Sequence, residues 1–278
     1  MLSKLTKKRI YHYGLRFLFL LLSLGVLATG VFVLWAANLK IPDFSKFEER
    51  KVAQSTKIYD RTGEVILYNM GEDIRRTIVP KEEISRHIKN ATVAIEDAEF
   101  YEHGGIKPKA ILRAALANLK VLLGGNGLTQ GGSTITQQVV KNSLLTNEKR
   151  LSRKLKEAIL AIKLEKSMDK ESILALYLNE SPYGGNIYGV EEASQAFFGK
   201  PSREISLAEA AYLAALPQAP TYYSPYGNHK DALDARARLV LSRMSELGFI
   251  SEEEEVEAKA ERATFLPQNN FSIKAPHF

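Results

Sequence analysis

The sequence predicts a mainly α-helical domain that follows one transmembrane helix and a small β element. Three observations lead to this prediction: a long uncharged apolar segment near the N-terminus, a short alternation of apolar and polar residues after it, and many later segments with apolar residues at helical spacing. With 278 residues, the chain has room for one sizeable domain and an appendage.

The apolar segment 17–37 contains 21 residues and no charged side chain. At about 1.5 Å per residue, a helix of this length spans roughly 30 Å, the thickness of the hydrocarbon core of a bilayer. Cleaved signal peptides have apolar regions of only about 7–15 residues, so we predict an uncleaved anchor. Five positive and no negative charges precede it, which predicts a cytoplasmic tail at 1–16 and an extracytoplasmic remainder, a type II topology.

The charge distribution argues against nucleic-acid binding. The net charge is +6, but the tail alone supplies five positive charges, so the remaining 262 residues are close to neutral. A nucleic-acid binder usually carries its positive charge on the folded domain. The chain has no cysteine, which excludes disulfides, thiolate metal sites and cysteine nucleophiles.

Residues 38–79 are predicted to form a juxtamembrane linker that contains a β-hairpin, because KIYDRTGEVILY alternates around a turn at Asp60–Gly63. From Pro80 the apolar residues follow helical spacing, and a helical domain is expected over 80–250. Its first helix should begin at Pro80. Start signals later in the domain are Asp169, Ser251 and the capping-box pair Ser206 and Glu209. Further helices are predicted at 108–123, 133–145, 150–167, 170–179, 189–197, 207–216, 230–247 and 252–262.

The predicted helix 108–123 separates apolar residues from three basic ones, Lys109, Arg113 and Lys120. Such a helix either packs on the core with a solvated basic face or lies in a membrane interface. The pattern alone leaves both interpretations open.

Glu96 stands in the stretch EDAEFYEHGG at the end of the first helix, with Val93 three residues before it and Phe100 four after it. Apolar neighbours favour the neutral form of a carboxyl group, which suits a general base or acid near neutral pH. Three acids and a histidine at a helix end are more often simply solvated.

The stretch GGSTITQQVVKN reads as a glycine-rich turn that enters a helix with Ser133 as its cap. Backbone N–H groups at such a terminus attract anions, and phosphate is a usual ligand. Gln137, Gln138 and Lys141 follow within one turn, so amides and a cation could share one ligand. Many helices begin in this way, and the pattern alone is weak.

Glu157 and Arg153 lie in a predicted helix at 150–167 that is apolar on two sides, so we expect this helix to be buried through the middle of the domain. Their spacing also fits an ordinary exposed ion pair. A carboxylate in a buried helix needs a reason, however. Two carboxylates with a group of cations (Lys141, Lys149, Arg150, Arg153, Lys154) suit the transfer of a sugar from a diphosphate leaving group.

At these residues the chain resembles the glycosyltransferase domain of class A penicillin-binding proteins and of monofunctional peptidoglycan glycosyltransferases. The resemblance covers roughly residues 80–245 and rests on five ordered motifs: EDAEFYEHGG, GGSTITQQVVKN, RKLKEAILAIKLE, KESILALYLNESPYGGNIYGVEEASQAFFGK and LAEAAYLAALPQAP. In the fourth motif we interpret Asn179, the glycines and the aromatic residues as architecture.

The resemblance implies a function for each matching residue. Glu96 would be the base that deprotonates the acceptor 4-hydroxyl, and Glu157 the second essential carboxylate, near the donor diphosphate. The implied substrate-binding residues are Phe100, His103, Ser133, Thr134, Gln137, Gln138, Lys141, Lys149 and Arg153. The family usually has arginine where Lys149 stands, and lysine lacks the bidentate fork, so phosphate binding by Lys149 is less secure.

The resemblance also implies a lysozyme-like helical lobe with a small membrane-associated jaw. The expected substrates are lipid II and the growing lipid-linked glycan, polymerised in β-1,4 linkage with release of undecaprenyl diphosphate. The expected surroundings are the bacterial cytoplasmic membrane and its lipid, with cell-wall synthesis proteins as further partners. No cofactor is required by the sequence. A divalent cation, Mg²⁺ or Mn²⁺, could assist at the diphosphate, and a metal site is not assigned.

Two other functions fit the sequence less well. A hydrolase or lytic transglycosylase acting on the same glycan would need one strong acid and no cationic group near Lys141. A catalytically idle scaffold would not need both Glu96 and Glu157. Residues 251–278 are expected to begin a linker to a transpeptidase domain, as in the class A proteins.

Overall fold

The computed structural model describes residues 4–39, 56–59, 61, 66–70, 75–110, 112–113, 117, 121, 132–144, 151–261 and 263–268. The chain divides into two compact units, Met1–Pro42 and Asp43–Phe278, each of which is described by itself.

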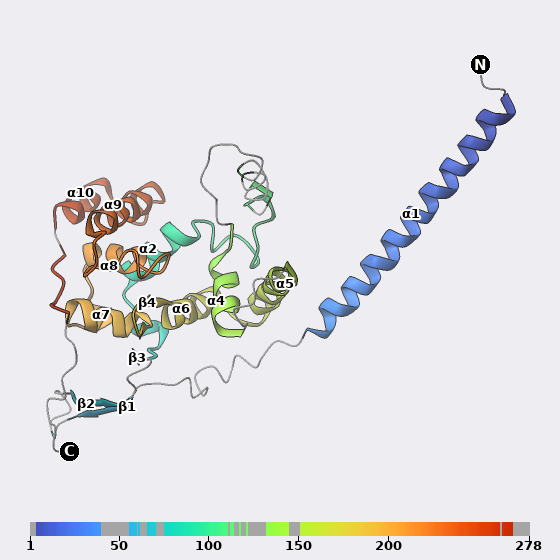
Figure 1. Ribbon diagram of the computed structural model, residues 1–278. Helices are drawn as coiled ribbons and strands as arrows, with labels where there is room; N and C mark the ends of the chain where they lie inside the picture. The colour runs from blue at the N-terminus through green and yellow to red at the C-terminus, as the bar shows by residue number, and fades with distance from the viewer. Residues whose placement is uncertain are drawn as a thin grey trace. The chain divides into compact units, whose positions relative to one another are not determined.

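The first unit is the helix α1 (Lys4–Asn38) (Figure 1). Its segment His12–Asn38 has a mean hydropathy of 2.6, and it is the one helix in the described part of the chain that is long and apolar enough to cross a membrane. The Ser23 and Thr29 hydroxyls donate to the backbone carbonyls of Leu20 and Gly25, so the helix satisfies these polar groups internally, as a bilayer demands. The predicted apolar helix is confirmed.

The second unit includes an antiparallel hairpin of β1 (Thr56–Tyr59) and β2 (Ile66–Met70), in which Thr56 faces Met70. This confirms the hairpin that the alternating pattern predicted. The register shifts between Ile58 and Tyr59.

The core of the second unit is built by α2 (Arg86–Glu96), α8 (Leu207–Ala215) and α9 (Lys230–Glu246), which pack on one another (Figure 1). Their fully buried side chains include Ile88, Val93, Leu213, Leu233, Val240 and Met244. Helix α10 (Glu252–Ala260) covers α9. The dominant force here is apolar burial, worth about 25 cal/mol per Å².

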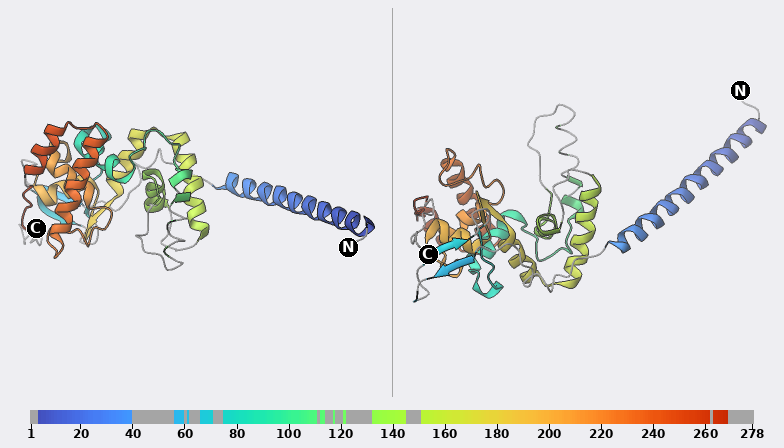
Figure 2. Two further views of the ribbon diagram at one scale, coloured as in Figure 1. Left: turned by 90° about the horizontal axis from the view of Figure 1, so that it is seen from above. Right: turned by 60° about the horizontal axis from the view of Figure 1, so that its bottom comes forward.

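A second group of helices carries the remaining motifs. Helix α4 (Ile135–Leu144) packs on both α5 (Leu151–Ser167) and α6 (Lys170–Glu180). In both views of Figure 2, α5 lies at the opposite end of this unit from α10. Because α6 touches α4 and leads on to α7 (Val190–Phe198), it connects the two groups.

A small sheet that the sequence did not predict joins distant segments. Its order is β3 (Arg75–Arg76), β5 (Ile187–Tyr188), β4 (Pro182–Gly184), with β3 parallel and β4 antiparallel to β5. Buried ion pairs hold it: Arg76 to Glu180 at 2.9 Å and Arg75 to Glu192 at 3.4 Å. Strands of two or three residues carry no readable alternation, which is why the pattern missed them.

Several predicted helix boundaries can be checked. The prediction that the first helix begins at Pro80 is wrong: Lys81–Glu83 form a 3-10 turn (η2), Ile84 is extended, and α2 begins at Arg86 with Ser85 as its cap. Asp169, Ser206 and Ser251 cap α6, α8 and α10 as predicted, and the last two close capping boxes.

The expectation that the helix at 150–167 is buried on two sides is also wrong. In α5, Glu157, Leu160 and Leu164 are buried, whereas Leu155 on the other face is 45% exposed. Among the described elements α5 packs mainly on α4, and its buried residues Glu157, Leu160 and Leu164 share one face. Most of the predicted helix 108–123 lies outside the described residues; of the side chains described there, Leu112 is 63% exposed.

Candidate active site

Glu96 is the last residue of α2, and its carboxylate is 12% exposed. Gln138 of α4 donates from Nε2 to Oε2 of Glu96 at 2.8 Å. On the other side, Nη2 of Arg236 in α9 lies 3.5 Å from Oε1. Three helices therefore fix this carboxylate. The apolar neighbours expected from the sequence, Val93 and Phe100, are indeed buried, but a cation also faces the carboxylate.

Arg236 was not among the predicted site residues. Its Nε donates to the Ala215 carbonyl at 3.0 Å, and its guanidinium lies 5.5 Å from the centre of the Tyr223 ring. These two contacts aim the remaining guanidinium nitrogens at Glu96. An arginine in an amphipathic helix carries no local signal of this role, because the partner carboxylate belongs to a segment far away in the sequence.

Two buried tyrosines, Tyr177 and Tyr183, border Glu96. Burial raises the pKa of Tyr177 well above its ordinary value, and the negative charge of Glu96 adds to this effect. Burial and then Glu96 raise the pKa of Tyr183 in the same way. Both phenols therefore stay neutral at physiological pH, so they add no competing negative charge around the carboxylate.

Asp97, the next residue, connects the turn after α2, which carries His103, to the start of α4. Its buried carboxylate accepts from His103 Nε2 at 2.9 Å, Lys107 Nζ at 3.0 Å and the Ile135 backbone N–H at 3.0 Å. Burial by itself raises the pKa of Asp97, but the hydrogen bonds from His103, from the Ile135 N–H and from Lys107 outweigh it, so the pKa is lowered. Nδ1 of His103 accepts from the Gly105 N–H, which leaves the ring proton on Nε2 for Asp97.

The turn that carries these residues is packed too tightly for most side chains. Gly105 has a φ of +91°, and a Cβ there would lie 2.7 Å from the Ala161 carbonyl oxygen of α5. Phe100 is fully buried, with Lys170 Nζ 4.5 Å from its ring centre. The Phe100 and His103 side chains thus brace the turn from inside; contact of either with substrate stays a prediction.

The start of α4 differs from the expectation in two ways. Its cap is Thr134 and not Ser133, because the Thr134 hydroxyl accepts from the Gln137 N–H at 3.1 Å while the Gln137 side chain accepts from the Thr134 N–H at 3.0 Å. This reciprocal pair is a capping box, and both side chains are buried. With Asp97 bound to the Ile135 N–H, the anion at this helix terminus is Asp97 itself.

Ser133 and Glu157 share one lysine. Lys154 Nζ donates to Ser133 Oγ at 2.7 Å and to Glu157 Oε2 at 2.6 Å. Arg153 Nε lies 3.3 Å from the other oxygen, Glu157 Oε1. The Glu157 side chain is 1% exposed, so two cations compensate a buried charge. The expected Arg153–Glu157 pair is present, and Lys154 completes it.

The remaining predicted residues are placed as follows. Lys141 is exposed on α4, one turn beyond Gln138. Lys149 lies outside the described residues. Asn179 pairs through its amide with both the N–H and the carbonyl of Val79, at 3.1 and 3.0 Å, which agrees with the architectural interpretation.

Comparison with known proteins places the chain in a family. Residues 63–245 match the transglycosylase family model. The chain is 45% identical over 233 residues to penicillin-binding protein 1A of Aquifex aeolicus, covering 84% of this chain and 31% of that protein. It is 40% identical over 259 residues to penicillin-binding protein 1A/1B of Bacillus subtilis, covering 92% and 27%. Since the family model matches more than half of the chain, the protein belongs to the transglycosylase family.

Two further similarities are to a third curated relative and to a solved structure. Penicillin-binding protein 1A of Clostridium perfringens (strain 13) is 39% identical over 262 residues, covering 91% of this chain and 38% of that protein. The crystal structure of penicillin-binding protein 1A from Haemophilus influenzae aligns at 25% identity with a TM-score of 0.44, over 77% of this chain and 21% of that chain. The chain spans about a third of the length of the curated relatives it matches.

Proposed function

We propose that the protein is a peptidoglycan glycosyltransferase that polymerises lipid II into β-1,4-linked glycan strands and releases undecaprenyl diphosphate, as the N-terminal part of a class A penicillin-binding protein. The observation that carries this proposal is the pair of carboxylates linked to α4 and to the residue just before it. Glu96 is bound by Gln138 of α4, and Glu157 connects through Lys154 to Ser133 just before α4.

Glu96 is the general base of this reaction. The acceptor 4-hydroxyl attacks the anomeric carbon of the donor and its proton passes to Glu96, while the bond from that carbon to the diphosphate oxygen breaks. A base must reach its proton within about 3 Å or through one water, and the partly exposed Glu96 carboxylate permits this. Attack from the face opposite the leaving group inverts the anomeric centre.

The leaving diphosphate is bound by side chains rather than by the N-terminus of α4. The backbone N–H groups of Thr134, Ile135 and Gln137 already bind side chains of the protein. Lys141 and Arg153 are the cations proposed to contact the diphosphate, because Lys141 is exposed and Arg153 is 23% exposed beside Glu157. Such charges stabilise the negative charge that develops as the bond breaks. Lys149 and Ser133 are proposed to complete this binding surface.

The proposal is tested with purified full chain and lipid-linked disaccharide. We expect glycan strands to lengthen, whereas a hydrolase or lytic enzyme would shorten pre-formed strands. Lys141→Ala and Arg153→Ala should weaken binding of the lipid substrate about tenfold, the loss of one charge-assisted contact. Lys166→Ala, an exposed lysine of α5, serves as the matched control. Failure of the parent chain to lengthen any glycan would refute the function.

We propose that a divalent cation, Mg²⁺ or Mn²⁺, where it assists, binds through the diphosphate oxygens. Within the described ranges no group of three or more histidine, aspartate or glutamate side chains is arranged to hold a metal ion. A chelator should then leave the thermal unfolding temperature unchanged, even if it slows polymerisation. A lower unfolding temperature would reveal a structural metal.

We further propose that α1 anchors the protein in the bacterial cytoplasmic membrane in the type II orientation, with other cell-wall synthesis proteins as partners. The support is the apolar span of α1 and the five positive charges before it. Exposed Leu112 and Leu155 suit contact with the outer lipid surface. Protease added to intact spheroplasts should digest residues 38–278; full protection would contradict this orientation.

A further inference from the structure

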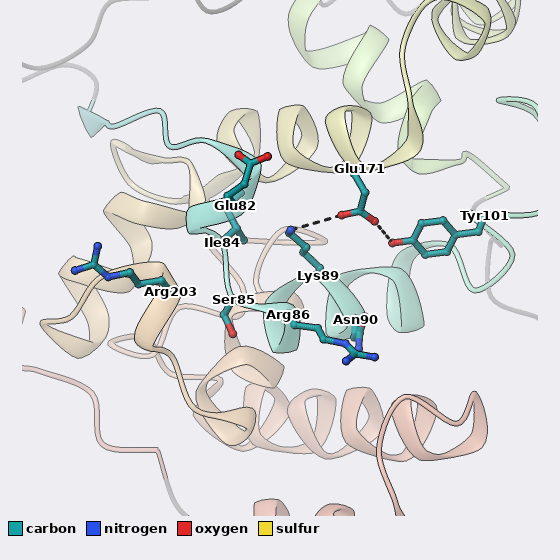
Figure 3. A pocket seen from close by; sticks show the side chains of 9 residues that line it. All are labelled: Glu82, Ile84, Ser85, Arg86, Lys89, Asn90, Tyr101, Glu171 and Arg203. Carbon is teal, nitrogen blue, oxygen red and sulfur yellow. Dashed lines mark hydrogen bonds and ion pairs between the residues drawn. The ribbon is translucent and has the colours of Figure 1, made fainter.

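A polar pocket of about 580 Å³ lies apart from the contacts described around Glu96 and Glu157. It is formed where the first half of α2 meets α6, the turn that carries Tyr101, and the short helix η3 (Ser202–Glu204). Figure 3 shows Tyr101 and Arg203 on opposite sides of this pocket, with Lys89 and Glu171 between them. Its volume falls within the range of sites that bind small ligands, about 300–1,000 Å³.

One side of the pocket offers an aromatic ring beside a fixed carboxylate. The Tyr101 hydroxyl donates to Glu171 Oε1 at 2.8 Å, and Lys89 Nζ lies 3.5 Å from Glu171 Oε2 (Figure 3). Burial and then the hydrogen bond and charge of Glu171 raise the pKa of Tyr101, so its phenol stays neutral. The Tyr101 ring is held edge-to-face by the buried Phe100, with 5.2 Å between ring centres, although Tyr101 itself is 47% exposed.

Three further polar side chains of the pocket are free to bind a ligand. Arg86 and Asn90 are neighbours on one face of α2, four residues apart, and their side chains lie close together in Figure 3. Neither side chain has a hydrogen-bond or ion-pair partner among the residues that the structure describes. Among the described residues, Arg203, which is 61% exposed, pairs only with its chain neighbour Glu204, at 3.3 Å. Two guanidinium groups and one amide are therefore available to a ligand.

This combination fits a sugar that carries a carboxylate. The exposed ring of Tyr101 can pack on the apolar C–H face of a pyranose, while Asn90 and Glu171 can bind its amide and hydroxyl groups. The arginines Arg86 and Arg203 can bind a carboxylate. A free phosphate or a phosphate monoester fits less well, because the carboxylates of Glu171 and Glu82 also border the pocket and repel a doubly charged group.

The pocket is also close to the proposed base. Lys89 precedes Glu96 by seven residues on the same helix, so the two are separated by roughly 10 Å along the axis of α2. We propose that this pocket binds a carboxylate-bearing segment of the glycan strand, an amino sugar with its lactyl-linked stem peptide, beyond the site of transfer. The proposal rests on the proposed function and names a second place where the same polymer is held.

The test measures binding separately from catalysis. The probe is a lipid-free tetrasaccharide of alternating N-acetylglucosamine and N-acetylmuramic acid with stem peptides, titrated calorimetrically into the full chain in detergent. The variant is Arg86→Ala with Asn90→Ala, which breaks no described side-chain contact. We expect its dissociation constant to rise about tenfold, equivalent to roughly 1.4 kcal/mol. Arg238→Ala, an exposed arginine of α9, is the matched control.

A second arm tests the role of the carboxylates and the aromatic ring. An N-acetylglucosamine tetramer, which lacks carboxylates, should bind more weakly than the stem-peptide tetrasaccharide, and the double variant should lose this preference. Tyr101→Ala should weaken binding of both oligomers. In polymerisation, the double variant should shorten the products more than it slows consumption of the lipid-linked disaccharide.

The outcomes separate this proposal from the proposed function. If the parent is active and the double variant has unchanged dissociation constants and product lengths, the proposed glycan-binding role of the pocket is wrong, while the proposed function stands. Reduced association with anionic phospholipid vesicles without any change in oligosaccharide binding would also overturn this role, in favour of a headgroup site. A parent that binds the tetrasaccharide through Arg86 and Asn90 but forms no glycan would refute the glycosyltransferase while leaving the pocket standing.

Discussion

Glu96 and Glu157, the two carboxylates of the proposed site, have different surroundings. Glu96 is 12% exposed and faces one amide and one guanidinium, the latter at 3.5 Å. Glu157 is 1% exposed and lies between two cations at 3.3 and 2.6 Å. The charge of Glu157 is therefore compensated by two close cations, whereas Glu96 has one cation at a slightly longer distance and a more exposed side chain.

The different surroundings fit the two different roles proposed for these carboxylates. Two titratable groups whose environments are pushed apart generally divide acid–base work from electrostatic work. Glu96 is suited to take the proton, and Glu157 to hold Arg153 and Lys154 in place for the donor. Replacing Glu96 should therefore lower mainly the rate, whereas replacing Glu157 should also weaken binding of the donor.

The largest effect is expected for Glu96→Gln. Glutamine keeps the size and can still bond to Gln138 but cannot accept the proton, and the loss of a general base typically costs about 10²–10⁴ in rate. Polymerisation should nearly vanish, with substrate affinity little changed. Single-turnover rates and equilibrium binding of lipid-linked disaccharide measure the two separately. Near-parent polymerisation would show that another group is the base.

Glu157→Gln should have the next largest effect, and in binding as well as rate. The substitution leaves Arg153 and Lys154 without their anionic partner, and a buried charge-assisted contact is worth about 1.5–3 kcal/mol. We expect donor affinity to fall roughly ten- to hundredfold, together with a lower unfolding temperature. If affinity is preserved while only the rate falls, Glu157 takes part in the chemical step and the contrast with Glu96 disappears.

Arg236→Lys tests the cation on the Glu96 side. Lysine keeps the charge but loses the planar fork that lets one arginine reach Ala215 and Glu96 together. We expect a rate about tenfold lower with unchanged donor affinity, the cost of one weakened polar contact. The exposed Arg238→Lys is the control. Equal rates in both variants would mean that Arg236 only packs against Tyr223.

The smallest effect concerns acid stability through Asp97. Its folded-state pKa is lowered, so its contribution to stability is fully present above the unfolded value of about 3.9 and is lost as pH falls through the folded value. Asp97→Asn should lower the free energy of unfolding by about 1–3 kcal/mol at pH 7 and flatten its decline below pH 4. Chemical denaturation from pH 2 to 7 measures the free energy of unfolding of the parent and the variant. Parallel pH dependences would contradict the stabilising role of the ionised Asp97.

The start of α4 shows how much of the candidate site could be predicted from the sequence. The sequence placed Ser133, Thr134, Gln137 and Gln138 together, because they stand within one helical turn. It could not say that Thr134 and Gln137 would bind each other, nor that Gln138 alone of the four would reach Glu96. Polar side chains near a helix start choose between the backbone and distant partners, and that choice depends on what else packs there.

The sequence by itself determined the apolar N-terminal helix, the hairpin, most of the later helices with several of their caps, and the two carboxylates with their motifs. These depend on local periodicity, capping chemistry and short-range spacing, which a single segment contains. Only the tertiary structure decided that Asp97 occupies the N-terminus of α4, that Arg236 reaches Glu96, and that Arg75 and Arg76 form a strand beside Ile187 and Tyr188. Each of these contacts joins segments far apart in the chain, so it exists only once apolar burial has brought the helices together.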